Sequence, residues 1–189
     1  MDRDPQGAGI LAVAARVPTL ELTADVVDRA HGRPPGRGSR RSAAYDDDAV
    51  TLAADAAERC LANAPGFDRT TLRALYVAST TWPRSAGPQA ERVAAALDLP
   101  ENVEISTLGG SWRCGAAALR LALASPRRPA LVVAADRLEA PAGSDGETSL
   151  GDGAAAVLVG DSSPCARVLA WTSLAEGTGM ASRALAEGR

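Results

Sequence analysis

The sequence predicts an α/β protein in which helices cover a largely parallel β-sheet. Short apolar runs rich in Val and Ala alternate along the chain with segments whose apolar residues recur at helical spacing. Of the 189 residues 46% are hydrophobic but only 3% are aromatic, so the core must consist mainly of Ala, Val and Leu. Small side chains require close backbone packing, which favours helices layered on a sheet. We expect one domain over 1–189, with its core at about 8–175 and a C-terminal tail at 176–189.

The first third of the chain predicts a strand, a short helix, a loop and a long helix. An apolar run at 9–18 predicts a buried strand, and 22–30 predict a short helix with Thr23 at its N-cap. The Gly/Pro-rich segment 31–45 predicts a loop. The segment 46–64 begins with acids and continues with apolar residues every three or four positions. This pattern predicts a long, well-capped helix.

The rest of the chain continues the alternation of strands and helices. Apolar runs predict strands at 71–80, 102–108, 128–137, 151–160 and 166–175. Helices are expected between the first three of these strands, at 87–99 and 111–125. A polar loop is expected at 139–149, and the tail at 177–189 is expected to form a short helix or a frayed end.

Composition and charge exclude several classes of function. The formal net charge of −3 provides no basic field for nucleic acid. No apolar stretch approaches the length of a membrane span, and the N-terminal apolar run is too short for a signal peptide. Cys60, Cys114 and Cys165 are widely spaced and form no metal-binding or disulfide pattern, so we expect no metal site. We therefore expect a soluble cytoplasmic protein.

Two glycine motifs are similar to known signatures, and neither signature fits. In GDG, Gly151 and Gly153 precede a predicted strand, whereas a phosphate loop must open a helix, so we expect a tight turn. GGSWR at 109–113 is similar to the nucleophile elbow of hydrolases, but Arg113 replaces the final glycine. The chain's single histidine, His31, also lies upstream, which excludes the hydrolase order of serine, acid and histidine. We expect His31 to be a solvated loop residue.

The order of elements and motifs resembles the N-terminal half of thiolase-fold condensing enzymes, in particular the ketoacyl-ACP synthase III and hydroxymethylglutaryl-CoA synthase group. The likeness covers roughly residues 8–160 and is carried by four stretches: 37–61, 72–83, 105–119 and 131–160. The third contains ISTLGGSWRCGAAAL and the fourth contains SLGDGAAAVLVG. The resemblance implies a thiolase-like layered sandwich of half length.

The resemblance also implies a nucleophile at the turn before 111–125. Such enzymes use a cysteine at a helix N-terminus, where the helix dipole favours the thiolate, to accept an acyl group from CoA or a carrier protein. Matching Gly115 and Leu119 to the family pattern puts Trp112 at this position, whereas a shifted match restores Cys114. Two residues are separated by about 200° around a helix, so both cannot occupy one site. The match with Trp112 keeps the pattern better and makes Cys114 a buried small residue; the alternative keeps Cys114 as the acyl acceptor.

Three further features bear on what the resemblance implies. Thr80 stands where hydroxymethylglutaryl-CoA synthases have a general-acid Glu, so the activity of those synthases is not expected here.

Arg40 and Arg41 lie in a stretch that resembles the loop near the CoA entrance, where they would bind the phosphates of CoA or phosphopantetheine. Alternatively, this basic loop only balances the acids of the adjacent YDDD. Trp112 would plug an acyl pocket, or is, like Trp82, an ordinary packing aromatic.

The family's His and Asn belong to a C-terminal half that has no counterpart here, so we do not expect the chain to be active alone. We expect as partner a separate C-terminal-half thiolase-like chain, a second copy of this chain or both, with an acyl carrier protein as a further candidate. A half-fold leaves a large apolar surface that such a partner would cover. Two other hypotheses stay open: a non-catalytic scaffold or thioester-binding pseudoenzyme, and an acyltransferase that uses Cys114. We expect CoA or phosphopantetheine thioesters as substrates, a place in specialised metabolism, no bound cofactor, and neither nucleic acid nor membrane as partner.

Overall fold

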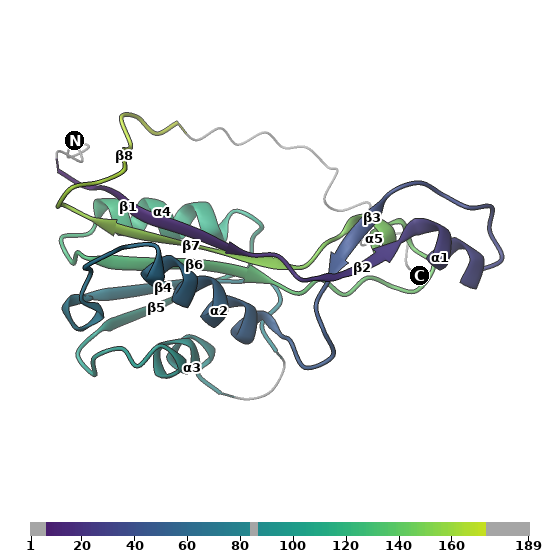
Figure 1. Cartoon of the computed structure of the whole chain (residues 1–189), viewed down its shortest axis with the longest axis horizontal. Coiled ribbons are helices and arrows are strands. Elements are labelled where there is room, and N and C mark those ends of the chain that lie inside the picture. Colours follow the sequence, from purple (N-terminus) through teal and green to yellow (C-terminus); the bar gives the residue numbers. More distant parts are fainter. Residues whose placement is uncertain (1–6, 84–86, 173–189) are drawn as a thin grey trace.

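A mixed sheet forms the centre of the computed structural model, which describes residues 7–83 and 87–172 (Figure 1). Its strands follow the order β5-β4-β6-β7-β1-β8. Their bounds are β1 (Gly9–Arg16), β4 (Ala74–Ala78), β5 (Glu104–Leu108), β6 (Ala130–Asp136), β7 (Gly153–Gly160) and β8 (Ala166–Arg167). β4 pairs in parallel with β5 and β6, whereas β7 is antiparallel to both β6 and β1. The pairing of β1 with β8 is also antiparallel, so three of the five pairings in this sheet are antiparallel and the expectation of a largely parallel sheet is wrong. The connection from β6 to β7 is not a crossover that returns the chain to the other end of the sheet, so β7 runs back against β6.

Helices cover both faces of this sheet. α2 (Ala49–Ala62) and α3 (Gln89–Ala96) pack on one face, and α4 (Cys114–Ala124) packs on the other (Figure 1). The β4 sequence ALYVA is buried along its whole length because it has a helical layer on each side. The side chains that fill the α2 face of the core are aliphatic and small, as the composition predicts; they include Leu52, Leu75, Leu131, Val133 and Leu158.

The long helix predicted at 46–64 is confirmed, and its start is defined by a capping box. Asp48 Oδ1 accepts hydrogen bonds from the N–H groups of Val50 and Thr51, each over 2.9 Å. Thr51 Oγ1 in turn accepts from the N–H of Asp48 over 2.7 Å. Asp48, the last of the three acids at the start of this segment, is therefore the N-cap that defines where α2 begins.

A small lobe lies at one end of the sheet (Figure 1). It contains the antiparallel pair β2 (Leu20–Thr23) and β3 (Ser39–Ser42), with α1 (Ala24–Ala30) and α5 (Asp145–Ser149) beside it. The expectation that 31–45 and 139–149 are plain loops is therefore wrong. The sequence of β3 is SRRS, so it has no apolar alternation to reveal it, and α5 is too short to show a period. Thr23 does occupy the N-cap of α1, although its side chain makes no capping hydrogen bond.

The last strand is much shorter than expected. Instead of the strand predicted at 166–175, β8 pairs only two residues with the start of β1. Residues 168–172 form no strand, and the tail predicted at 176–189 lies outside the described residues. The helix predicted at 111–125 also begins later than expected. It starts at Cys114, because residues 111–113 form the turn that precedes α4.

Candidate active site

The turn between β5 and α4 places Trp112 and Cys114 in opposite environments. Gly110 adopts φ +74, a left-handed conformation that suits glycine, and the chain then turns into α4. The N–H of Cys114 donates to the carbonyl oxygen of Ser111 over 2.9 Å. The Trp112 side chain is 73% exposed, whereas Cys114 is only 6% exposed. One residue of the pair therefore projects into solvent while the other packs against the sheet.

The surroundings of Cys114 favour the neutral thiol. Its side chain belongs to the buried cluster beneath α4, together with Tyr76, Ala78 and Val132. Burial raises the pKa of the Cys114 thiol, and the negative charge of Asp136 raises it further, against the smaller opposing effect of backbone N–H groups at the start of α4. A cysteine that attacks thioesters needs the opposite shift. The role of Cys114 as an acyl acceptor stays a prediction, and its environment works against it.

Asp136 joins the ends of β4 and β6, and sequence reasoning missed it. Its Oδ1 accepts hydrogen bonds from the hydroxyls of Ser79 (3.1 Å), Thr80 (3.0 Å) and Thr81 (3.0 Å) and from the N–H of Thr80 (2.7 Å). Thr80, at the position where the resemblance would place a general acid, is therefore a hydrogen-bond donor to a neighbouring carboxylate. The available signal was an acidic residue directly after the buried run ALVVAA.

Arg40 and Arg41 serve different parts of the structure. The Nη1 of Arg40 donates to the carbonyl oxygen of Leu150 over 2.7 Å and more weakly to that of Leu138 over 3.3 Å. Arg41 Nη1 instead donates to the carbonyl oxygen of Thr19 over 3.1 Å, and its side chain is 48% exposed. Neighbouring residues of a strand point to opposite faces, so the two guanidinium groups of β3 do not converge on one phosphate.

Asp152 explains the GDG motif. The residue is 8% exposed, and its two carboxylate oxygens accept from the N–H groups of Ala43 (2.7 Å) and Leu138 (2.8 Å). Its own N–H donates to the carbonyl oxygen of Arg41 over 3.0 Å. The motif therefore ties the end of β3 and the loop after β6 to the start of β7. The expected central strand after GDG is confirmed, because β7 begins at Gly153 and lies between β6 and β1. The expected tight turn is not found, because residues 150–152 are irregular and contain no left-handed glycine.

His31 lies in the small lobe and not at the turn before α4. Its Nε2 is 3.3 Å from Glu147 Oε2, and Glu147 also accepts a hydrogen bond from the N–H of Gly143. The histidine is exposed, as expected, but it joins the end of α1 to α5 and is not a plain solvated residue.

The described part of the chain contains neither a clustered metal-ligand set nor a membrane-spanning helix. In 7–83 and 87–172, no group of three or more His, Cys, Asp and Glu side chains is placed to hold a metal ion. No helix within these ranges has the length and apolar character needed to cross a membrane.

Comparisons with known proteins identify relatives over most of the chain. It is 25% identical over 166 residues to a hydroxymethylglutaryl-CoA synthase of Methanocaldococcus jannaschii, which covers 82% of this chain and 48% of the relative. It is 24% identical over 171 residues to a hydroxymethylglutaryl-CoA synthase of Methanosphaera stadtmanae, covering 85% and 49%. The chain thus spans about half the length of the curated relatives it matches. No protein-family profile matches it.

Solved structures show the same relationship. The structure of MvaS in complex with 3-hydroxy-3-methylglutaryl coenzyme A superimposes with a TM-score of 0.71 at 28% identity and covers 82% of this chain and 40% of that one. A priming β-ketosynthase from a polyketide biosynthetic pathway gives 0.69 at 25% identity, covering 83% and 51%. A 3-oxoacyl-(acyl-carrier-protein) synthase III has the same fold, with a TM-score of 0.67 at 22% identity. The chain therefore has the thiolase fold, and over about half of their length it is similar to the condensing enzymes of the hydroxymethylglutaryl-CoA synthase and ketoacyl-ACP synthase III group.

Proposed function

We propose that this chain is one half of a two-part enzyme that condenses acyl thioesters, and that its β5–α4 turn does not supply the nucleophile. The observation that carries the proposal is the pairing of an exposed Trp112 with a buried Cys114 at that turn. Indole has no nucleophilic atom suited to thioester attack, and the Cys114 thiol has a raised pKa. The similarity to hydroxymethylglutaryl-CoA synthases, and to MvaS in complex with 3-hydroxy-3-methylglutaryl coenzyme A, supports CoA or phosphopantetheine thioesters as the substrate class.

The outer face of α4 supports the need for a complementary half. Only one of its eleven residues is charged, and a helix that is apolar on all sides suits burial on all sides. One side packs on the sheet, while the other leaves Leu121 50% exposed next to the exposed Ala117 and Ala124. We call this outer side, together with Trp112 at its start, the α4 face.

An uncovered part of the sheet continues the α4 face. Val13 of β1 is 53% exposed and pairs with Val157 of β7, which packs in the cluster beneath α4. Directly opposed residues of an antiparallel pair point to the same side of the sheet, so Val13 and α4 share a side. A second thiolase-like half that brings the His and Asn of the family would cover this surface. A second copy of the present chain would cover it without supplying them.

The test combines the mass of the chain in solution with acyl transfer. The purified chain, its Cys114→Ala variant and, as a control for an exposed thiol, its Cys165→Ala variant are incubated with acetyl-CoA and malonyl-CoA and measured by intact-protein mass spectrometry. We expect no adduct at Cys114 and a mass in solution above that of one chain. An adduct that is lost in Cys114→Ala and kept in Cys165→Ala would overturn the proposal and make the chain an acyl acceptor.

A non-catalytic scaffold or thioester-binding role is the second candidate, favoured by the same Trp112, which the resemblance places at the nucleophile position although its indole cannot attack a thioester and its side chain projects into solvent. Co-expression with a C-terminal-half thiolase-like chain separates the two roles. The two-part enzyme predicts condensation of acyl-CoA substrates by the complex. A complex that forms, binds acyl-CoA and shows no turnover would favour the scaffold.

A further inference from the structure

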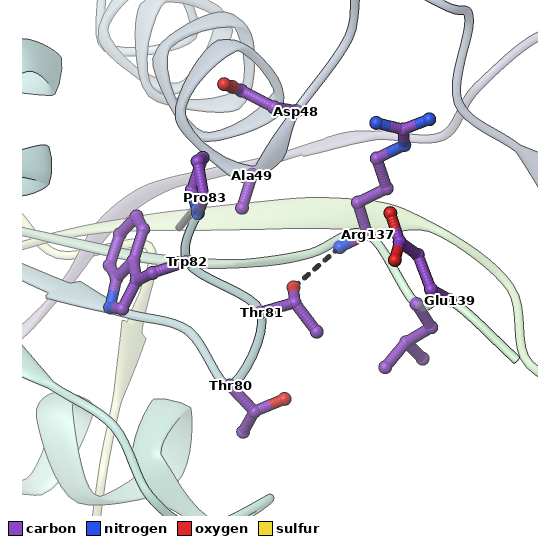
Figure 2. A pocket seen from close by; sticks show the side chains of 9 residues that line it. Asp48, Ala49, Thr80, Thr81, Trp82, Pro83, Arg137 and Glu139 are labelled. Atoms are coloured by element: carbon purple, nitrogen blue, oxygen red, sulfur yellow. Dashed lines mark hydrogen bonds between the residues drawn. The ribbon is translucent and has the colours of Figure 1, made fainter. Parts of the chain in front are cut away.

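A cavity of about 540 Å³ lies beside the ends of β4 and β6, on the α2 side of the sheet (Figure 2). The loop 80–83 after β4 and the loop 137–139 after β6 form two of its walls, and Asp48 and Ala49 at the start of α2 form the third. Cys114 packs on the opposite side of the sheet, beneath α4. The cavity therefore lies on the other side of the sheet from Cys114, although its wall residue Thr80 stands where the resemblance would place a general acid. Ligand binding in it is measured without any condensing activity, so its failure is distinguishable from failure of the proposed function.

The topology of the sheet accounts for a cavity at this place. From β4 the chain proceeds through α3 to β5 on one side, and from β6 it proceeds to β7 on the other side. Neighbouring strands whose connections leave in opposite directions have a crevice between their carboxyl ends, and α/β sheets bind ligands in such crevices. The loops 80–83 and 137–139 are the two connections that leave β4 and β6.

The walls of the cavity are held in place by the protein itself. The hydroxyl groups of Thr80 and Thr81 donate to Asp136. The N–H of Arg137 donates to Thr81 Oγ1 over 2.9 Å (Figure 2). The N–H of Leu138 donates to the buried Asp152 over 2.8 Å. Both loops are thus fixed by hydrogen bonds at the positions that line the cavity, as expected of a preformed small-molecule site.

Arg137 supplies the charge that a ligand would meet. Its backbone is fixed, but within 7–83 and 87–172 its guanidinium has neither an ion-pair partner nor a hydrogen bond. On the other side of the cavity lie the indole of Trp82 and the ring of Pro83 (Figure 2). The residues present therefore combine one available planar cation with an apolar wall opposite it. A guanidinium binds carboxylate and phosphate oxygens in pairs.

The neighbouring acids decide between these two anions. Asp48 and Glu139 also line the cavity, and the Asp48 carboxylate already accepts two N–H groups at the start of α2. Two negative charges repel a dianionic phosphate about twice as strongly as a carboxylate at the same distance. We propose that the cavity binds a small organic carboxylate whose carboxylate group pairs with Arg137 and whose apolar or aromatic body lies against Trp82 and Pro83.

The proposal is tested with benzoate as the probe, benzamide as its neutral analogue and inorganic phosphate as the competing anion. Each is titrated into the full chain by amide-detected NMR, and affinities are taken from the shifts. We expect benzoate to shift the amides of 80–82 and 137–139, and benzamide and phosphate to bind at least ~10-fold more weakly. Absence of benzoate binding, shifts confined to other segments, or tighter binding of phosphate would each overturn the proposal.

Matched arginine variants test whether the carboxylate of benzoate pairs with Arg137. Arg137→Gln removes the charge and should weaken benzoate at least ~10-fold, while Arg137→Lys, which keeps the charge without the planar fork, should lie in between. Arg120→Gln on α4 is the control, because the Arg120 guanidinium has no ion-pair partner within the same described residues and lies on the other side of the sheet. Unchanged melting temperatures establish that the variants are folded. Equal benzoate affinity in Arg137→Gln and Arg120→Gln would contradict the assignment.

Discussion

Thr80 is bound to Asp136 through both its backbone and its side chain. The N–H of Thr80 donates to Asp136 Oδ1 over 2.7 Å, and Thr80 Oγ1 donates to the same oxygen over 3.0 Å. The hydroxyls of Ser79 and Thr81 donate to it as well. At the place where the resemblance would put a catalytic acid, the protein therefore has a set of donors gathered around one carboxylate, which joins β4 to β6.

Two substitutions of Asp136 should destabilise the fold to different extents. Asp136→Asn keeps an acceptor oxygen but loses the charge, and we expect it to lower the free energy of unfolding by about 1–2 kcal/mol. Asp136→Ala leaves the buried Ser79 hydroxyl and the Thr80 N–H without this acceptor, for which we expect about 2–4 kcal/mol. Urea unfolding measures both. Asp161→Ala, at an ion pair on the surface, is the control, and an equal loss there would contradict the role given to Asp136.

The raised pKa of Cys114 predicts that its thiol is alkylated slowly at pH 7. Because burial and Asp136 raise this pKa, less thiolate is present at pH 7, and alkylation by iodoacetamide should be much slower than at the exposed Cys165. Its rate should rise with pH as thiolate forms, and should rise at pH 7 in Asp136→Asn. Cys60, whose pKa burial raises to about 11, should react more slowly still. Time courses mapped by mass spectrometry measure all three; equal rates for Cys114 and Cys165 at pH 7 would contradict this account.

The sequence was sufficient for elements whose pattern is dictated by the core. The acids before residue 49 and the helical apolar spacing of 46–64 predicted α2, and the unbroken apolar run before Asp136 predicted β6. It was not sufficient for β3, which is held by backbone pairing to β2 and contains only Ser and Arg. Elements without an apolar face depend on contacts between distant segments, and those contacts leave no local pattern.

At the candidate active site, too, sequence reasoning found some features and missed others. Trp112 and Cys114 differ sharply in exposure, but helical spacing is not the reason, because Trp112 lies in the turn before α4 and only Cys114 lies on the helix. The partners of Asp136 and Asp152 come from residues more than fifty positions away or from loops without a motif, so sequence reasoning did not find them. Arg40 and Arg41 were expected to bind phosphate because their stretch resembles the loop near the CoA entrance, whereas the alternation of β3 turns their side chains to opposite faces. Their role as phosphate ligands stays a prediction.

Arg40 and Arg41 should therefore differ in their effect on stability. Arg40→Gln removes the donors to the carbonyl oxygens of Leu138 and Leu150, and we expect the free energy of unfolding to fall by about 1–3 kcal/mol. Arg41→Gln removes contacts at the surface and should cost less than about 1 kcal/mol. Chemical unfolding of the two variants side by side measures the difference. If Arg41→Gln were the more destabilising, the structural role given to the two hydrogen bonds of Arg40 would be wrong.

Replacing Asp152 with asparagine should lower the stability of the fold. Both carboxylate oxygens accept from backbone N–H groups, so Asp152→Asn would turn an NH2 group toward the N–H of either Ala43 or Leu138. A buried donor facing a donor loses one hydrogen bond and leaves two groups unpaired, which should cost about 2–4 kcal/mol. Asp46→Asn, in the exposed loop before α2, is a control of the same chemistry and should change stability by less than about 0.5 kcal/mol. A stability of Asp152→Asn close to that of Asp46→Asn would contradict the hydrogen bonding described here.

A charge placed on the α4 face should prevent association without unfolding the chain. Leu121 is 50% exposed on α4, and Val26 is 51% exposed on α1 in the small lobe, so Leu121→Glu and Val26→Glu introduce the same group at the same exposure. Both should leave the free energy of unfolding within about 0.5 kcal/mol, because neither side chain is buried in the single chain. Light scattering over a range of concentrations should show loss of association in Leu121→Glu alone, because burying a carboxylate in an apolar interface requires its desolvation. Association that survives Leu121→Glu, or that is lost equally in Val26→Glu, would mean that the α4 face is not the surface that a partner covers.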